Sequence, residues 1–95
     1  MYLARVMGTV VATQKEPSMN GSKFLIVEKL DEKLKALGEY VVAVDAVGAG
    51  ENEVVLYASG SSARQTRETK DRPADAVIMA IVDSFAVGDK TIYKK

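Results

Sequence analysis

Cysteine and histidine are both missing from this chain of 95 residues. Without cysteine no disulfide can form, so nothing in the chain points to an oxidising compartment. Zinc sites built from cysteine and histidine are excluded. A cysteine nucleophile and a serine that relies on histidine as its base are excluded as well. We expect no metal site and no cofactor.

Long apolar runs and net charge are missing too. No apolar run reaches the roughly 18–20 residues that a membrane span needs. The first residues, "MYLARVMGTVVATQKE", carry Arg5 inside their apolar run and lack the layout of a signal peptide. Thirteen basic residues balance thirteen acidic ones, so no net field attracts nucleic acid or an anionic membrane. We expect a soluble, cytoplasmic protein with neither kind of partner.

The length of the chain predicts a single domain over residues 1–95. Its composition, 47% hydrophobic and 27% charged, is that of a globular protein. A domain this small buries only about 60–65% of the surface that its unfolded chain exposes. A partner surface would therefore help to stabilise it.

Five apolar segments have the length and the β-branched composition of strands. They are Tyr2–Thr13, Lys23–Leu30, Tyr40–Val47, Val54–Ser59 and Ala76–Val87, and a short sixth, Thr91–Tyr93, would add an edge strand after the Gly88-Asp89 turn. Several of these strands are apolar on both faces, whereas an antiparallel sheet with one wet face alternates apolar and polar residues. This pattern predicts a small closed barrel whose outer wall packs against other copies. The alternative is a single compact sandwich that buries both faces by itself.

The stretch Gly48-Ala49-Gly50 could begin a phosphate cradle, but its surroundings argue against one. A dinucleotide-binding loop has a third glycine where this chain has Glu53, and a helix where this chain has the apolar strand Val54–Ser59. The Gly-Lys-Ser/Thr of a phosphate-binding loop is absent as well. We interpret the stretch as a tight turn between strands that requires positive φ, which Asn52 also tolerates.

The stretch Gly60-Ser61-Ser62 could hold a nucleophile or start a helix. Ser62 and Gln65 have the spacing of a capping box, which predicts a short helix over about 63–68. A serine nucleophile would need a base, and none lies in this turn. Arg64 could pair with a carboxylate of a neighbouring subunit, although a solvated arginine is the commoner outcome.

Asp45 and Asp83 each interrupt a strongly apolar segment. A buried carboxylate needs a partner. The two could form a catalytic pair, but such residues more often accept backbone hydrogen bonds at turns or pair with arginine or lysine at an interface. We expect no enzyme. The acidic stretch Glu51–Glu53 has the character of a solvated loop. An OB-type barrel that binds single-stranded nucleic acid or a small ligand remains the alternative function, although six Tyr and Phe residues and zero net charge favour it little.

Three stretches in one register resemble a known family. "LARVMGTVVATQKEPSMNGSKFLIVE", "VAVDAVGAGENEVVLYASGSSAR" and "AVIMAIVDSF" are similar to the EutN/CcmL family, the pentameric vertex proteins of bacterial microcompartment shells. The resemblance implies a mostly all-β fold, an OB-like five-stranded β-barrel with one short helix. It also implies a homopentamer that caps the five-fold vertices of a shell tiled by hexameric proteins, without catalysis.

The resemblance also implies places for particular residues. Two turns would lie toward the subunit interface or the ring axis, together with Asp83; they contain Gly48, Ala49, Gly50, Gly60, Ser61, Ser62 and Arg64. A loop over 14–22 would contact adjacent shell tiles through Gln14, Lys15, Pro17 and Gly21. The family often has glycine where this chain has Asn52, which puts the shape of that loop in question but not the fold.

Overall fold

The computed structural model describes residues 1–12, 21–60 and 75–95 and consists almost entirely of strands. The strands are β1 (Tyr2–Val10), β2 (Phe24–Leu30), β3 (Ala36–Asp45), β4 (Val54–Ser59), β5 (Ala76–Ile81), β6 (Ser84–Val87) and β7 (Lys90–Lys94). The short helix expected over 63–68 lies outside the described residues. Within the described part of the chain, no helix has the length and apolar character needed to cross a membrane.

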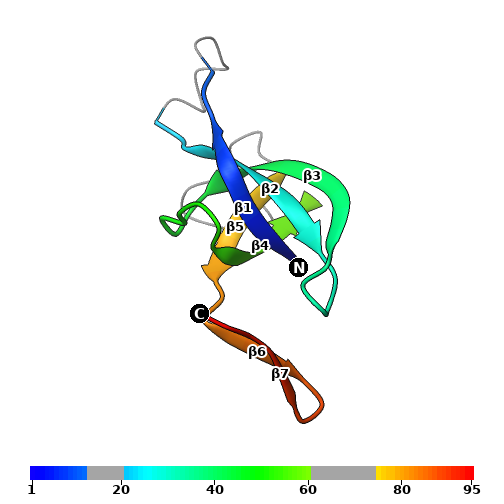
Figure 1. The fold of residues 1–95 in the computed structure, drawn as a ribbon. Helices are drawn as coiled ribbons and strands as arrows, with labels where there is room; N and C mark the ends of the chain where they lie inside the picture. The colour runs from blue at the N-terminus through cyan, green and yellow to red at the C-terminus, as the bar shows by residue number, and fades with distance from the viewer. Residues whose placement is uncertain (13–20, 61–74) are drawn as a thin grey trace.

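Five strands close into a barrel in the order β1-β2-β3-β5-β4, with β4 paired back onto β1 (Figure 1). All pairings are antiparallel except that of β3 with β5, which is parallel and short. The predicted five-stranded, OB-like barrel is therefore confirmed. Because the sheet closes on itself, the barrel removes most of the open strand edges that a flat sheet would expose.

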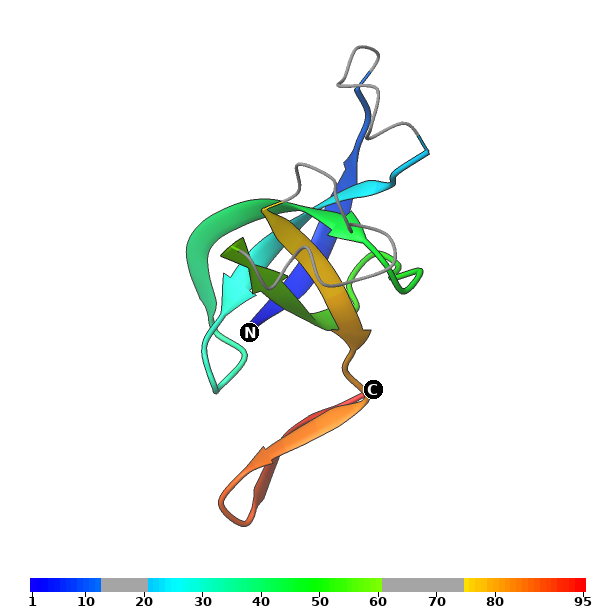
Figure 2. The same ribbon diagram turned by 180° about the vertical axis from the view of Figure 1, so that it is seen from behind.

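The segment predicted as one strand over Ala76–Val87 is in fact two strands. The amide of Val82 donates to the carbonyl of Val54 (2.8 Å), which is the last bond to the barrel before the chain turns away at Asp83. β6 and β7 then form a separate two-stranded hairpin that extends beyond the barrel, as both views show (Figures 1 and 2). The expected sixth strand thus exists within β7, but it pairs with β6 and not with the edge of the barrel.

The barrel interior is filled by small and β-branched side chains around one aromatic residue. Among the described residues, Tyr57 is the largest side chain that is fully buried, and its ring stacks on that of Tyr2 with centroids 5.2 Å apart. The interior cluster comprises Ala4, Val6, Leu25, Val27, Ala43, Ala49, Val55, Tyr57, Ala76 and Ile78. The alternating positions that the sequence shows on each strand therefore supply a core within one chain.

A second apolar cluster lies on the outside of the same strands. Val44, Val77 and Ala58 are register partners across β3, β5 and β4, and they alternate with residues of the interior cluster. All three are buried within the single chain, and Phe24, Ala46 and Met79 pack against them. The prediction that these strands are apolar on both faces is confirmed, but part of the outer surface is already covered without another copy.

Another part of the outside stays exposed. A β-bulge between Val6 and Gly8 shifts the register of β1 on β2, so that Gly8 lies opposite Ile26. Ile26 in turn lies opposite Val42, and Glu28 lies opposite Tyr40. These positions alternate with Val27 and Val41, which belong to or pack on the interior cluster, so they face outward. We call Ile26, Glu28, Tyr40 and Val42 the outer wall; the exposed fractions of Tyr40 and Val42 are 57% and 51%.

Candidate functional site

The turn after β3 is organised by one buried carboxylate. Oδ1 of Asp45 accepts the amides of Val47 and Gly48, both at 3.0 Å, and Oδ2 accepts the amide of Ala49 at 3.0 Å. The side chain is only 2% exposed, and Nζ of Lys23 lies 3.9 Å from Oδ2. Three amides and one cation therefore offset the cost of burying this charge. Of the roles that the sequence left open for Asp45, backbone hydrogen bonding at a turn is confirmed.

A second carboxylate closes the same turn from its other side. Oε1 of Glu53 accepts the amide of Gly50 at 2.6 Å, and its other oxygen pairs with the ammonium of Lys95. The pKa of the Glu53 carboxyl is held below its ordinary value. The larger cause is the hydrogen bond from Lys95, and the second is the bond from the amide of Gly50. Glu51 and Asn52 are exposed, as expected for a solvated loop, whereas the carboxylate of Glu53 also bonds to the chain through both oxygens.

Three successive amides, those of Gly48, Ala49 and Gly50, thus point at carboxylates of the chain itself. A phosphate cradle needs such amides free to face an incoming anion. Here the donors are already used, and the two carboxylates would repel a phosphate. The geometry supports the interpretation of this stretch as a structural turn.

The backbone conformations of this turn agree only in part with the sequence. Gly48 and Asn52 have positive φ values of 76° and 67°, as expected for a tight turn in which asparagine replaces glycine. Gly50 does not lie in the left-handed region, so the expectation of positive φ is wrong for this residue. Its constraint is steric, because a Cβ atom there would lie 3.3 Å from Oε1 of Glu53.

The turn is fixed to the barrel along β1. The amide of Asn52 donates to the carbonyl of Val6 (2.8 Å), and the amide of Val6 donates to the carbonyl of Glu53 (2.9 Å). The guanidinium of Arg5 adds a bond to the carbonyl of Asn52 (3.0 Å). Residues 45–53, which we call the carboxylate loop, therefore form a rigid projection with few unused polar groups.

The second glycine turn lies elsewhere. Gly60 has a φ of 64°, and its amide donates to the carbonyl of Asp75 (3.0 Å). Gly60 follows β4, and the carboxylate loop precedes β4. This six-residue strand, about 20 Å long, therefore separates the two turns. The structure therefore does not bring them together into one site. Ser61, Ser62 and Arg64 lie outside the described residues, as do Gln14, Lys15 and Pro17, whereas Gly21 is described and has a φ of 84°.

Asp83 is exposed and does not face Asp45, whose oxygens are taken by its own turn. The carbonyl of Asp83 accepts the amide of Lys95 (2.8 Å), and the ammonium of Lys95 reaches Glu53. Lys95 thus connects the hairpin to the carboxylate loop. The sequence analysis missed this link, because no local pattern relates two residues that are 42 positions apart.

Two kinds of ligand, metal ions and nucleic-acid bases, can be compared with the described residues. Within residues 1–12, 21–60 and 75–95, no group of three or more acidic side chains is arranged to hold a metal ion. Tyr57 is buried against Tyr2, and the ammonium of Lys29 lies 5.0 Å from the centre of the Tyr2 ring. Tyr57 is therefore not available to stack on a base, because its ring is buried.

A closed five-stranded barrel, a rigid carboxylate loop and an exposed apolar wall define a small structural barrel domain suited to packing against other proteins. The comparisons with known proteins name its family. The family model described as "Ethanolamine utilisation protein EutN/carboxysome" matches residues 1–83, and the chain belongs to the EutN/CcmL family.

Relatives of known name cover almost the whole chain. The carboxysome shell vertex protein CcmL of Synechococcus elongatus is 52% identical over 95 residues, covering 100% of this chain and 96% of that protein. The solved structure of Gloeobacter violaceus CcmL superposes with a TM-score of 0.96 at 48% identity, covering 100% of this chain and 98% of that one. The pentameric microcompartment shell protein GrpN of Rhodospirillum rubrum gives a TM-score of 0.86 at 45% identity, covering 93% of this chain and 100% of that one.

Proposed function

We propose that this chain is a structural protein that forms a homopentamer and caps the five-fold vertices of a bacterial microcompartment shell. The observation that carries the proposal is the similarity over the full chain to proteins named shell vertex proteins, one of which is described as pentameric. The same similarity favours this function over an OB-type barrel that binds nucleic acid or a small ligand.

The surface of the barrel gives the proposal a physical basis. A ring of five identical copies requires heterologous contacts, in which one surface of a copy meets a different surface of the next. The outer wall exposes Tyr40 and Val42 to solvent in the single chain. Burying apolar surface is worth about 25 cal/mol per Å², so a few hundred Å² at each contact would contribute several kcal/mol before the cost of association.

The turns are proposed to lie at the subunit interface or near the axis of the ring. Gly48, Ala49 and Gly50 belong to the carboxylate loop, whose rigidity suits a close contact between copies. Gly60, with Ser61, Ser62 and Arg64, would form a second contact at the other end of β4, and Asp83 would lie at the base of the hairpin. A loop containing Gln14, Lys15, Pro17 and Gly21 is proposed to contact the neighbouring hexameric tiles.

We further propose that the chain has no catalytic role. The two carboxylates that interrupt apolar strands do different things: Asp45 binds three backbone amides, and Asp83 is exposed at the start of the hairpin. General acid–base catalysis needs a pair of groups poised over a common substrate position. The engagement of Asp45 with its own turn supports a structural role for it.

The capping role can be tested by co-expressing hexameric shell proteins with and without this chain and imaging the purified shells by electron microscopy. The proposal predicts closed polyhedra that contain the chain at their corners, and shells with open corners when it is omitted. Shells that are closed in its absence, or that exclude it when it is present, would contradict the capping role.

A further inference from the structure

The β6–β7 hairpin is joined to the barrel by a single short connection. The last backbone bond of the barrel is made by the amide of Val82, which donates to the carbonyl of Val54 (2.8 Å). The first bond of the hairpin is made by the next residue, since the carbonyl of Asp83 accepts the amide of Lys95 (2.8 Å). β6 and β7 form their own sheet, and neither packs extensively on a barrel strand. The backbone at 82–83 therefore has the character of a hinge.

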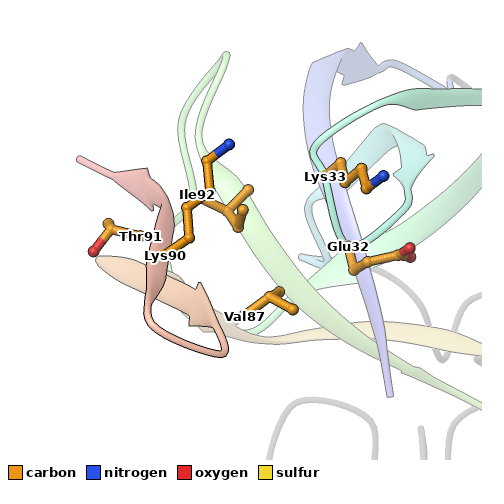
Figure 3. A pocket seen from close by; sticks show the side chains of 6 residues that line it. All are labelled: Glu32, Lys33, Val87, Lys90, Thr91 and Ile92. Atoms are coloured by element: carbon orange, nitrogen blue, oxygen red, sulfur yellow. The ribbon is translucent and has the colours of Figure 1, made fainter.

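The hairpin is braced along its length and has space on one side. The rings of Phe85 and Tyr93 stack across its two strands with their centroids 6.2 Å apart. On one side, a groove of about 530 Å³ separates the hairpin from the loop that follows β2 (Figure 3). The residues that line this groove are Val87, Lys90, Thr91 and Ile92 of the hairpin and Glu32 and Lys33 of the loop. The hairpin therefore has room to swing toward the loop as a unit.

A side-chain link ties the base of the hairpin to the barrel. The ammonium of Lys95 pairs with Oε2 of Glu53, while the amide of Lys95 is bonded to Asp83 at the base of the hairpin. Glu53 is itself fixed to the barrel, because Oε1 accepts the amide of Gly50 (2.6 Å) and its carbonyl accepts the amide of Val6 (2.9 Å). Within residues 1–12, 21–60 and 75–95, the other two ion pairs join parts of the barrel and its loops to one another. We call the Lys95–Glu53 pair the clasp.

We propose that the clasp is a conformational device that sets the angle between the hairpin and the barrel. With the clasp formed, the hairpin has two attachments to the barrel, and the ion pair restricts rotation about the hinge at 82–83. With the clasp broken, only the hinge remains, and the hairpin moves over the groove. Because the clasp lies at the base of the hairpin, a small rotation there becomes a larger displacement at the turn Gly88-Asp89. The device does not depend on the proposed pentamer, since hinge and clasp lie within one chain.

The clasp suits a switch because little stability depends on it. The side chain of Lys95 is 49% exposed and that of Glu53 is 22% exposed. Ion pairs that water reaches in this way contribute little to the free energy of unfolding. Breaking the clasp should therefore leave the barrel folded while it changes the position of the hairpin. This combination distinguishes a positioning contact from one that only stabilises the fold.

Double electron–electron resonance between two spin labels measures the angle, and the chain has no cysteine of its own to interfere with labelling. Thr9→Cys in β1 and Asp89→Cys at the tip of the hairpin are exposed positions for the labels. Labelled chain is refolded with a large excess of unlabelled chain of the same variant, so that each distance lies within one copy. The parent chain should give one narrow distance. In Lys95→Met the distribution should widen by about 5 Å, because a rotation of about 20° moves the end of a four-residue strand, about 13 Å long, by that much.

Three further variants make the test specific. Glu53→Gln breaks the clasp from the barrel side and should widen the distribution as Lys95→Met does. Lys95→Arg keeps the charge and should keep the narrow distance. Lys94→Met removes a lysine from the adjacent position and, as the matched control, should also keep it. At neutral pH, the urea midpoints of all four variants should lie close to that of the parent chain.

Three outcomes would overturn the proposal. The clasp does not set the angle if Lys95→Met keeps the narrow distance, if Lys94→Met widens it equally, or if the parent distance is already broad. A large fall in the urea midpoint of Lys95→Met would assign the pair to the stability of the fold instead. The pentamer is judged separately by the mass of the unmodified chain: a monomer would contradict the ring and leave the distances within one chain valid.

Discussion

The barrel and the β6–β7 hairpin meet their need for burial in different ways. The barrel closes on itself and fills its interior with its own side chains. On its outside, Val44, Ala58 and Val77 are buried within the same chain. The hairpin has one pair of stacked rings and a groove that its own chain leaves open. The barrel therefore buries its apolar side chains by itself, whereas the hairpin leaves part of its own apolar surface open, with Val87 49% exposed.

The carboxylate loop resembles the barrel, because its polar groups find their partners within the same chain. Its amides are bonded to Asp45 and Glu53, and its backbone is bonded to β1. Its amides are therefore not available to a phosphate, because the chain itself supplies the anions that they bind. Lys95 joins this loop to the hairpin, because its ammonium pairs with Glu53 and its amide donates to the carbonyl of Asp83.

The largest effect should come from a cavity in the barrel. Leu25 is buried in the interior cluster, so Leu25→Ala should lower the free energy of unfolding by about 2–5 kcal/mol. Val87→Ala in the hairpin should lower it by less than about 1 kcal/mol, because Val87 is 49% exposed. Urea unfolding followed by circular dichroism measures both. Equal losses from the two variants would break the comparison, since the hairpin would then belong to the core.

The second largest effect should come from removing the buried carboxylate of Asp45 in the carboxylate loop. Asp45→Ala leaves three amides without their acceptor, which we expect to cost about 3 kcal/mol of unfolding free energy. Asp45→Asn retains one acceptor oxygen and should lose roughly half as much. The urea midpoints of the two variants decide the matter. If Asp45→Ala is as stable as the parent chain, the carboxylate does not organise the loop.

Two glycines of the loop should respond differently to the same change. Gly48→Ala puts a side chain at a φ of 76° and should cost about 1–2 kcal/mol. Gly50→Ala meets only Oε1 of Glu53, which can move by a few tenths of an ångström, so we expect less than about 0.5 kcal/mol. Thermal unfolding of the two variants at one concentration provides the measurement. The opposite order would mean that the backbone strain lies at Gly50.

The smallest effect should come from the link between the two regions. Because the pKa of Glu53 is lowered in the folded chain, its contribution is complete above the ordinary value of 4.5 and is lost as the pH falls through the lower folded value. Glu53→Gln should therefore flatten the fall in melting temperature as the pH drops below the ordinary value of 4.5. Lys95→Met should have a similar but weaker effect, because the bond from Gly50 remains. An unchanged acid profile in both variants would show that Lys95 does not hold the hairpin to the loop.

The sequence predicts the barrel well because each barrel strand carries its own signal. Val54–Ser59 was placed with the bounds that the structure has, and Asp45 was recognised as a carboxylate that needs a partner. The break after Ile81 was missed, since apolar residues continue on both sides of it and only the bond from Val82 to Val54 shows where the barrel ends.

Contacts between distant residues account for the other misses. Gly48 and Gly50 look alike in the sequence, and only the bonds of the loop decide which of them takes positive φ. The role of Glu53 depends on Lys95, which no neighbouring residue reveals. The groove likewise arises from two segments, at 32–33 and 87–92, that only the folded chain brings to face each other.

The central claim is that a single copy leaves an apolar surface which only further copies cover. Native mass spectrometry of the unmodified chain at micromolar concentration tests it most directly. The account predicts one dominant species with the mass of five chains. A dominant species with the mass of one chain, 10.2 kDa, would contradict it.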